Sequence, residues 1–532
     1  MVRILSRKPF ILAVRQFYGW GCGSWIFLAA FTIHLAASPG HAARGQLELN
    51  VVDQATGEPV AVQLRLTHQS GRLVRAPHLT REGDWQVFDG RTVLALAPGT
   101  YRFEMQRGLE YRTRTGHFLI KSGAADSHHV EMVPFVRMRD EGWWSGDLGT
   151  TRESLGSLAL RALATDVEHL TLTTADNRGR ESRAEQMLAI AARELNNADR
   201  IGLTGIRDVR PGGEVLLYGA SHLLKLPATT AYLPGPFATA QLALEQPSQA
   251  VPPVHIHVSH VTSWNMPTWV ALGLANSVGV LHDGIGPGPA NDAAGDRPRD
   301  LVLFPDVTGL ARWAQHVYFQ LLESGHRIAP GAGSSGVGGQ RALGTNRVYV
   351  HCGRELTPSA WSQGLRAGQV MVTNGPLLRA TFGGELPGHV FQSSVGEPMK
   401  LEIEARLSTR QKIRYLEIVQ NGRPVHQVRL EDWVAKQGQL PPVVFEQSGW
   451  ALVRAVADEP GQYFAAMTGP VYVEIGDRPR ISREAAAFFL EWVYARARLI
   501  QETDPRLRRE ILTPHRTARD YWQQKIEYAT VD

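Results

Sequence analysis

Apolar and polar positions alternate with a period of two through residues 43–136. Residues 47–52 (LELNVV) follow this pattern, a turn at 56–57 (TG) comes next, and residues 60–66 continue as a second apolar-rich run. Side chains on a strand point alternately to its two faces, so this period indicates strands with one buried face. We therefore predict a small β-sandwich over residues 43–136.

The pattern changes over residues 137–378, where helical periods alternate with short apolar runs. Residues 182–196 and 308–324 carry apolar side chains at helical spacing, whereas residues 169–173 and 254–258 have the length and composition of strands. Alternation of this kind is typical of α/β architecture, which we predict for this segment.

Residues 379–478 return to strand patterns, and the Asn421–Gly422 pair predicts a hairpin turn within a second β-sandwich. Residues 479–532 have helical periods, with Ser482 as a typical N-cap and Pro514 expected to open a final helix. The predicted fold is a multidomain α/β plus all-β protein, in which two β-sandwiches flank an α/β domain and a helical tail follows.

The first 42 residues have the composition of an export signal. Basic residues precede an apolar run at 25–37 (WIFLAAFTIHLAA), and the small residues of 40–42 (GHA) suit a cleavage site. The apolar run is about 13 residues long, whereas a spanning helix needs roughly 20, so a signal peptide is favoured over an N-terminal anchor. We expect an exported protein that is periplasmic, secreted or anchored at the membrane through this segment alone.

The charge balance argues against a nucleic-acid partner. The chain has 56 basic and 51 acidic residues, and four of the basic residues lie in the acid-free first 42 positions. The rest of the chain is nearly neutral and carries no clustered basic run that would bind a phosphate backbone. Cys22 lies in the leader and Cys352 stands alone, so no cysteine-based metal site is expected.

Three histidines are concentrated in one short segment, at His255, His257 and His260. On a strand His255 and His257 point to the same face, and two such imidazoles can bind one metal ion. The alternative is a pair of half-buried histidines with ordinary hydrogen bonds. The residues alone favour the second interpretation.

Two acidic residues are candidates for acid–base chemistry. Asp176 ends a predicted strand, which is a frequent functional position in α/β barrels, and Glu214 follows a turn at 210–213 (RPGG). A helix-capping role explains such carboxylates equally well. Residues 331–336 (GAGSSG) match the dinucleotide fingerprint and approach that of a nucleophile elbow, but no helical pattern follows them, which argues against both functions.

Several blocks of the chain resemble one branch of hydrolases. Residues 142–148 (GWWSGDL) resemble the opening block of the CehA/McbA branch of the PHP (polymerase and histidinol phosphatase) superfamily. Residues 344–350 (GTNRVYV), 364–369 (GLRAGQ) and 373–377 (TNGPL) resemble its closing block. The resemblance implies a distorted α/β barrel over residues 137–378 that holds two or three divalent metal ions. Such ions lower the pKa of a bound water, which then attacks a phosphoester or related ester.

The chain departs from the family pattern at the positions where the resemblance places metal ligands. These degenerate positions are Gly149, Thr151, Ser335 and Val337. Histidine and carboxylate side chains that remain as candidate ligands are Asp176, Glu214, His222, His255, His257, His260 and His282. Because a metal site draws its affinity from the full ligand set, the inherited centre should be lost. A relocated single-metal site around His255, His257 and His260 is the alternative.

We therefore expect a catalytically degenerate relative of these hydrolases that acts as a ligand-binding or scaffolding protein. Trp143, Trp144 and Trp264 would line the barrel mouth, where aromatic side chains suit a small organic or carbohydrate ligand. One alternative is an active hydrolase of phosphoesters or related esters with a non-standard site for Zn, Mn or Fe. The other is a structural envelope protein.

Overall fold

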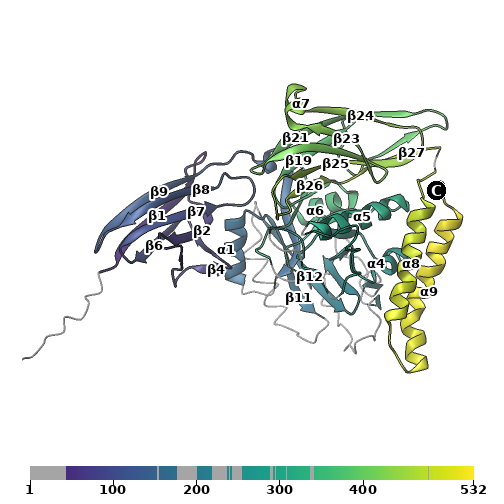
Figure 1. The fold of residues 1–532 in the computed structure, drawn as a ribbon, viewed down its shortest axis with the longest axis horizontal. Helices are drawn as coiled ribbons and strands as arrows, with labels where there is room; N and C mark the ends of the chain where they lie inside the picture. The colour runs from purple at the N-terminus through teal and green to yellow at the C-terminus, as the bar shows by residue number, and fades with distance from the viewer. Residues whose placement is uncertain are drawn as a thin grey trace, which may run out of the picture. The chain divides into compact units, whose positions relative to one another are not determined.

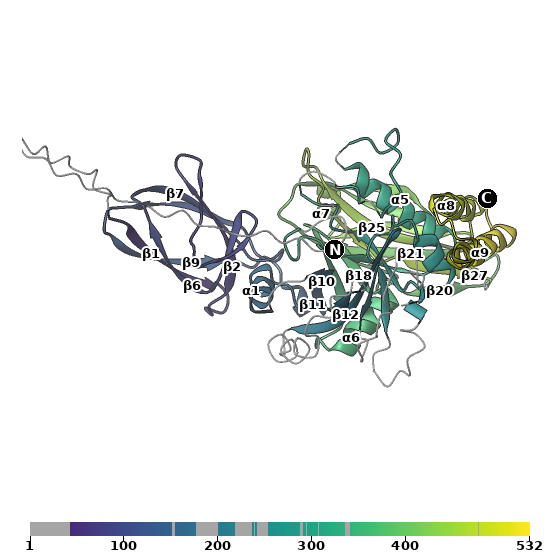
Figure 2. The ribbon, with the colours of Figure 1, turned by 90° about the horizontal axis from the view of Figure 1, so that it is seen from below.

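A computed structural model describes residues 43–151, 155–176, 200–218, 237–238, 240–241, 254–287, 291–293, 295–306, 308–335, 341–476 and 478–532. Residues 43–532 are rich in strands (Figures 1 and 2). The predicted helix at 182–196 lies outside the described residues.

The first two sheets are built from residues 45–132. Their strands are β1 (Gly45–Asp53), β2 (Ala61–His68), β3 (Leu73–Val74), β4 (Thr80–Glu82), β5 (Trp85–Asp89), β6 (Arg91–Leu96), β7 (Gly99–Gln106), β8 (Arg114–Ile120) and β9 (Ala125–Met132). One sheet has the order β6-β1-β9, and the other has the order β4-β5-β2-β7-β8 with β3 beside β2. Alternate residues of β1 are buried in a core to which both sheets contribute, as the period of two predicts.

A long mixed sheet begins with β10. Its first part comprises β10 (Trp143–Thr151), β11 (His169–Asp176), β12 (Ile201–Arg210), β13 (Gly213–Tyr218), β14 (His255–Val258), β15 (Ser277–Leu281), β16 (Ala329–Ala332), β17 (Arg347–His351) and β18 (Val370–Thr373). Helical elements in this region are η1 (Met138–Glu141), α1 (Leu155–Thr165), α4 (Met266–Ala271), α5 (Gly309–Glu323) and α6 (Pro358–Ala367).

Strand direction in this sheet determines where functional side chains can gather. β10, β11 and β12 are mutually parallel, β13 runs against its neighbours, and β14, β15 and β16 are again parallel to one another. The carboxyl ends of these six parallel strands therefore lie along one edge, where functional groups of α/β folds usually sit. The sheet is curved, because β16 at its end also contacts β10, β17 and β18.

The same sheet continues without a break into the C-terminal strands. The elements of the C-terminal region are β19 (Leu377–Phe382), β20 (Val390–Ser393), β21 (Met399–Ser408), β22 (Ile413–Gln420), β23 (Arg423–Arg429), α7 (Leu430–Ala435), β24 (Gln439–Phe445), β25 (Gly449–Ala457), β26 (Ala465–Thr468) and β27 (Val471–Ile475). β18 pairs with β26, and the order then runs β25-β22-β23. A second sheet, β19-β21-β24, shares one core with it. The predicted hairpin is confirmed, because Asn421 and Gly422 have φ angles of 49° and 77° between β22 and β23.

Two helices, α8 (Arg483–Leu499) and α9 (Pro505–Glu527), pack against each other at the end of the chain (Figure 2). Ser482 caps α8 by accepting a hydrogen bond from the Ala485 N–H at 3.2 Å, as predicted. The prediction that Pro514 opens the last helix is wrong. Asp504 caps α9 through the N–H groups of Arg506 and Leu507, and Pro514 lies inside the helix. None of the described helices has both the length and the apolar character of a membrane-spanning segment.

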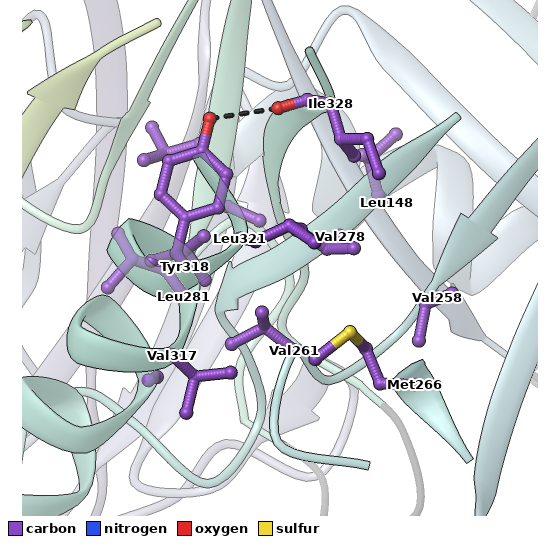
Figure 3. Packing of buried hydrophobic residues seen from close by; sticks show 14 of the residues in the cluster. Leu148, Val258, Val261, Met266, Val278, Leu281, Val317, Tyr318, Leu321 and Ile328 are labelled. Atoms are coloured by element: carbon purple, nitrogen blue, oxygen red, sulfur yellow. Dashed lines mark hydrogen bonds between the residues drawn. The ribbon is translucent and has the colours of Figure 1, made fainter. Parts of the chain in front are cut away.

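The largest core lies between the curved sheet and its helices. Val317, Tyr318 and Leu321 of α5 pack against Val278 and Leu281 of β15 (Figure 3). The Tyr318 hydroxyl donates a 2.9 Å hydrogen bond to the Ile328 carbonyl, so this polar group is satisfied within the core. The predicted helix at 308–324 is confirmed as α5, and its apolar stripe holds the sheet in place.

Candidate metal centre

The carboxyl ends of β14 and β15 bring together a compact group of metal-binding side chains. His260 follows β14 by two residues, and His282 and Asp283 follow β15 directly. One ligand atom from each of these three residues lies within 4.8 Å of the other two. Asp296, from the loop before α5, adds a second carboxylate to the group, since its Oδ2 is 2.8 Å from His260 Nδ1. We call these four residues the His260 cluster.

His260 is the centre of the His260 cluster. Its Nε2 lies 2.6 Å from Asp283 Oδ1, and its Nδ1 faces Asp296. The His282 ring stacks on the His260 ring with centroids 3.9 Å apart, and His282 Nδ1 is 3.6 Å from the same Asp283 oxygen. All four side chains are buried. Two imidazoles and two carboxylates form a donor set that suits Zn, Mn or Fe.

The electrostatics of the His260 cluster depend on its protonation. Burial opposes a charged imidazole, but Asp296 and Asp283 outweigh it and raise the pKa of His260 well above its usual value. Burial and the nearby His260 lower the pKa of His282. For both aspartates, burial raises the pKa, but attraction to His260 prevails and lowers it. The cluster therefore holds one imidazolium between two carboxylates, and a metal ion would displace the proton on Nε2.

The loop that carries His282 and Asp283 is held by residues far along the chain. Arg341 donates hydrogen bonds from Nε to the Asp283 carbonyl at 2.7 Å and from a terminal nitrogen to the Pro287 carbonyl at 2.8 Å. Asn346 donates from Nδ2 to the His282 carbonyl at 2.8 Å. These contacts hold the backbone of the loop, and with it the positions from which His282 and Asp283 project.

Two buried polar atoms of the His260 cluster have no hydrogen-bond partner among the described residues. These atoms are Nε2 of His282 and Oδ2 of Asp283. An unsatisfied buried polar atom in a native protein calls for an explanation such as a water or an ion. The His260 cluster therefore suits a metal ion in two respects: its side chains are metal ligands, and two of their buried atoms lack a hydrogen-bond partner among the described residues.

The predicted grouping of three histidines is divided in the structure. His255 and His257 point to the same face of β14, and each has a ring nitrogen 2.8 Å from the Ser277 hydroxyl. Burial lowers the pKa of His257 to about 3 and that of His255 well below its usual value, so both are neutral. His255 and His257 both contact the Ser277 hydroxyl, whereas His260 contacts Asp283 and Asp296. Among the described residues, His260, His282 and Asp283 are the only three histidine, cysteine or acidic side chains whose ligand atoms lie close enough together to hold one metal ion.

The acidic candidates lie near this edge with different partners. Glu214 forms a 2.6 Å ion pair with Arg207 and accepts a hydrogen bond from the Ser259 hydroxyl at 3.2 Å, next to His260 in the sequence. Asp176 ends β11, but its side chain is outside the described part of the structure. His222 and Val337 also lie outside the described residues.

The positions at which the resemblance places the first ligands are closely packed. A Cβ atom added to Gly149 would lie 2.5 Å from the backbone nitrogen of Ser335 and 2.9 Å from Asp147 Oδ1. Asp147 is fully buried and accepts hydrogen bonds from the N–H groups of Gly149, Ser334 and Gly344 at 2.7–2.9 Å. Thr151 ends β10, and its side chain is not among those described. Backbone thus fills the space that a ligand side chain at position 149 would need.

The tryptophan candidates do not share one pocket. Trp143 and Trp144 begin β10, at the edge opposite the His260 cluster, and are buried in core packing. Trp264 is half-buried and meets Trp492 of α8 edge-on, with ring centroids 6.4 Å apart. The tail helix α8 therefore packs against the loop after β14. Of the three, only Trp264 lies near the carboxyl ends of the parallel strands.

Sequence reasoning missed Asp283, Asp296 and the supporting Arg341. Asp283 had a usable signal, because a His–Asp pair directly follows the short apolar run at 277–281 (SVGVL). Asp296 had none, since it lies in a long irregular segment and meets His260 only through tertiary structure.

Comparisons with known proteins give no assignment. Neither a family model nor a curated protein matches the chain. The TIE protein of Bacillus anthracis is 18% identical over 20% of this chain and 19% of its own, at a TM-score of 0.14. The pilus-presented adhesin Spy0125 (Cpa) is 11% identical over 18% and 28%, at a TM-score of 0.13. The N-terminal four Ig domains of Dscam1 isoform 8.4 are 8% identical over 82% and 73%, also at a TM-score of 0.13. The chain thus spans less than a third of the first two proteins, and TM-scores this low assign neither fold nor function.

Proposed function

We propose that the chain is an exported, catalytically degenerate relative of the CehA/McbA branch of PHP metallohydrolases and acts as a binding or scaffolding protein. The packing around Gly149 is the observation that carries this proposal. A histidine at that position would overlap the Ser335 backbone, and three backbone N–H groups already occupy the Asp147 carboxylate. A multinuclear metal centre has neither the ligands nor the volume that it needs there.

The arrangement of strands supports the barrel that this proposal includes. Two sets of parallel strands, β10-β11-β12 and β14-β15-β16, place their carboxyl ends along one edge, and β16 curves back to contact β10. We assign the barrel to residues 137–378, between sandwiches at 43–136 and 379–478 and a helical tail at 479–532. Residues 1–42 serve as the export signal or anchor.

Hydrolysis assays on the purified mature protein test the proposal. We expect no turnover of a chromogenic phosphomonoester, phosphodiester or carboxylic ester after loading with Zn, Mn or Fe. Turnover that increases with bound metal and disappears with a chelator would show that the chain is an enzyme.

A second candidate function is an active metal-dependent hydrolase with a non-standard, single-metal site, and the His260 cluster favours it. His260, His282, Asp283 and Asp296 would hold the ion, and a bound metal supplies a water of lowered pKa for attack on an ester. The ring stack and the Arg341 contacts already orient these side chains.

Zinc titration of the chelator-treated protein tests this second candidate. We expect about one ion per chain, and at least a tenfold loss of affinity in Asp283→Asn, because loss of even a partner that orients a ligand costs about 10–100-fold. Asp84→Asn is the matched control, since the side chain of Asp84 is 68% exposed and far from the His260 cluster in sequence. Equal zinc affinity in Asp283→Asn and the unmodified protein would exclude the His260 cluster as the metal site.

A further inference from the structure

A polar cavity of about 190 Å³ lies at the edge of the curved sheet opposite the His260 cluster. The cavity is bounded by the strand ends of the first two sheets, by η1 and by the residues that precede β11 and β12. Charged side chains dominate its lining, and those that carry the argument are Arg107, Glu110, Arg137, Arg139, Asp166 and Glu168.

Two glutamates in this cavity are buried without an ion-pair partner among the described residues. Glu110 accepts hydrogen bonds from the Met138 N–H at 2.8 Å and the Tyr349 hydroxyl at 3.1 Å, and Glu168 accepts one from the Ser145 N–H at 2.6 Å. Glu110 is 6% and Glu168 is 8% exposed. Within the described part of the chain, neither carboxylate forms an ion pair. A buried carboxylate without a counter-charge must take up a proton or attract a cation.

Guanidinium groups line the same cavity. Arg137 forms an ion pair with Asp53 at 2.9 Å and lies directly before η1, which carries Arg139. Arg107 is 8% exposed and forms an ion pair with Asp166 at 2.7 Å, yet its buried Nε meets no hydrogen-bond acceptor among the described residues. The cavity therefore offers positive groups together with the two unpaired glutamates. Such a pattern is complementary to a molecule that bears both charges.

We propose that this cavity binds a small zwitterion of the amino-acid class, with its ammonium group against Glu110 and Glu168 and its carboxylate against Arg137 and Arg139. The volume suits a small amino acid. A bare metal ion fits less well, because the carboxylates of Glu110, Asp166 and Glu168 do not form a metal group as the His260 cluster does. The site is separate from the His260 cluster, so its fate does not depend on the proposed function.

Protonation of the glutamates gives the proposal a second readout. Burial raises the pKa of Glu110 to about 7, and the nearby Asp166 carboxylate adds to this effect. Hydrogen bonds and the Arg347 charge lower this pKa, but their effect is weaker. Burial, with Glu110 and Asp166 adding to it, raises the pKa of Glu168 to about 8. An ammonium group that binds there displaces these protons. Binding of the zwitterion should therefore release protons at pH 7 and tighten as the pH rises to 8.

Isothermal titration calorimetry of the full mature chain with glycine tests the proposal. We expect saturable binding at pH 8, at least tenfold tighter than binding of methylammonium or acetate, and a heat that varies with the ionisation enthalpy of the buffer at pH 7. Glycine betaine, whose methylated nitrogen cannot donate hydrogen bonds, should not bind measurably. Absence of glycine binding, or equal binding of glycine and glycine betaine, would overturn the proposal.

Two variants locate the binding site. Glu168→Gln should weaken glycine binding at least tenfold, whereas Glu431→Gln, on the exposed face of α7, should leave it unchanged. If Glu168→Gln does not fold, Arg139→Gln serves instead, because Arg139 is only half-buried. It should weaken binding of glycine and acetate without affecting methylammonium. Full glycine affinity in a folded Glu168→Gln or Arg139→Gln protein would contradict the assignment.

Discussion

At the scale of single residues, Gly149 leaves no room for a side chain at a position where the family resemblance places a metal ligand. The glycine allows the Ser335 backbone to approach to a distance that any Cβ atom would forbid. The nearby Asp147 carboxylate then serves as an acceptor for backbone N–H groups. A histidine placed at position 149 should therefore not create a metal centre.

The substitution Gly149→His tests this closure. We expect a loss of about 1–3 kcal/mol in the free energy of unfolding, since overpacking in a filled core has that cost, and no increase in bound metal. Urea unfolding and elemental analysis measure the two effects. Val444→His, at an exposed position of β24 that pairs with Lys400, is the control for adding a histidine. A stable Gly149→His protein that gains a metal ion would refute the closed packing.

Glu168 gives a residue-scale prediction about pH. Its pKa rises from an ordinary value near 4.5 to about 8 in the folded protein, first because of burial and then because of Glu110 and Asp166. Between these two values the unfolded chain releases the proton while the folded chain keeps it, so stability falls as the pH rises. Glu168→Gln cannot ionise, and we expect its melting temperature to fall less between pH 5 and pH 8.

Melting temperatures at unit pH steps measure this slope. The Glu431→Gln control should follow the unmodified protein throughout, because that side chain is exposed. Identical slopes in Glu168→Gln and the control would show that Glu168 keeps an ordinary pKa.

At the scale of elements, helix α8 contacts several loops near the edge of the sheet where the parallel strands end. Arg496 donates from Nε to the Asn265 side chain at 2.8 Å and also to the Pro211 carbonyl. The Arg297 guanidinium lies 4.8 Å from the ring centroid of Trp492. The tail is therefore part of the framework around the His260 cluster, which its own amphipathic pattern could not reveal.

Replacement of Arg496 by methionine tests the role of α8. Arg496 is 7% exposed, and its loss leaves Asn265 Oδ1 and the Pro211 carbonyl without this donor. We expect a cost of about 1–3 kcal/mol in the free energy of unfolding, as for other buried polar groups that lose their partner. Arg498→Met, two residues further along α8 at an exposed position, should have little effect. Equal unfolding midpoints of the two variants in urea would argue against the bracing role.

Local signals predicted the elements that depend on local chemistry. The Asn421–Gly422 turn, the Ser482 cap and the stripe of α5 all involve residues a few positions apart, so the sequence contains their causes. The start of α9 does not follow from Pro514, because the Asp504 side chain caps the helix directly before Pro505.

The candidate site was only partly predictable for a different reason. His260 and His282 were expected, but the Asp283 and Asp296 contacts connect segments 23 and 36 residues away from His260. Contacts between residues so far apart in the sequence depend on the order of the strands in the sheet, which short sequence patterns do not determine.

At the scale of the whole molecule, export is the prediction with the widest consequences. If residues 1–42 are a cleaved signal, mass spectrometry of the protein recovered from the cell envelope or medium should find Ala43 as the first residue. A full-length N-terminus recovered with membranes would instead identify the segment as an anchor. Full-length protein in the cytoplasmic fraction would contradict export.

The ladder between β18 and β26 joins two regions that sequence patterns divide near residue 378. Met371 pairs with Thr468 and Thr373 pairs with Ala466 in an antiparallel register, so these strands form one uninterrupted sheet. In a recombinant fragment that ends at residue 378, β18 would be an unpaired edge strand whose free N–H and C=O groups could pair with another chain. Expression of residues 137–378 or 379–478 alone should therefore yield aggregates. Any shortened version made for crystallography or engineering will need to include residues 137–478 together.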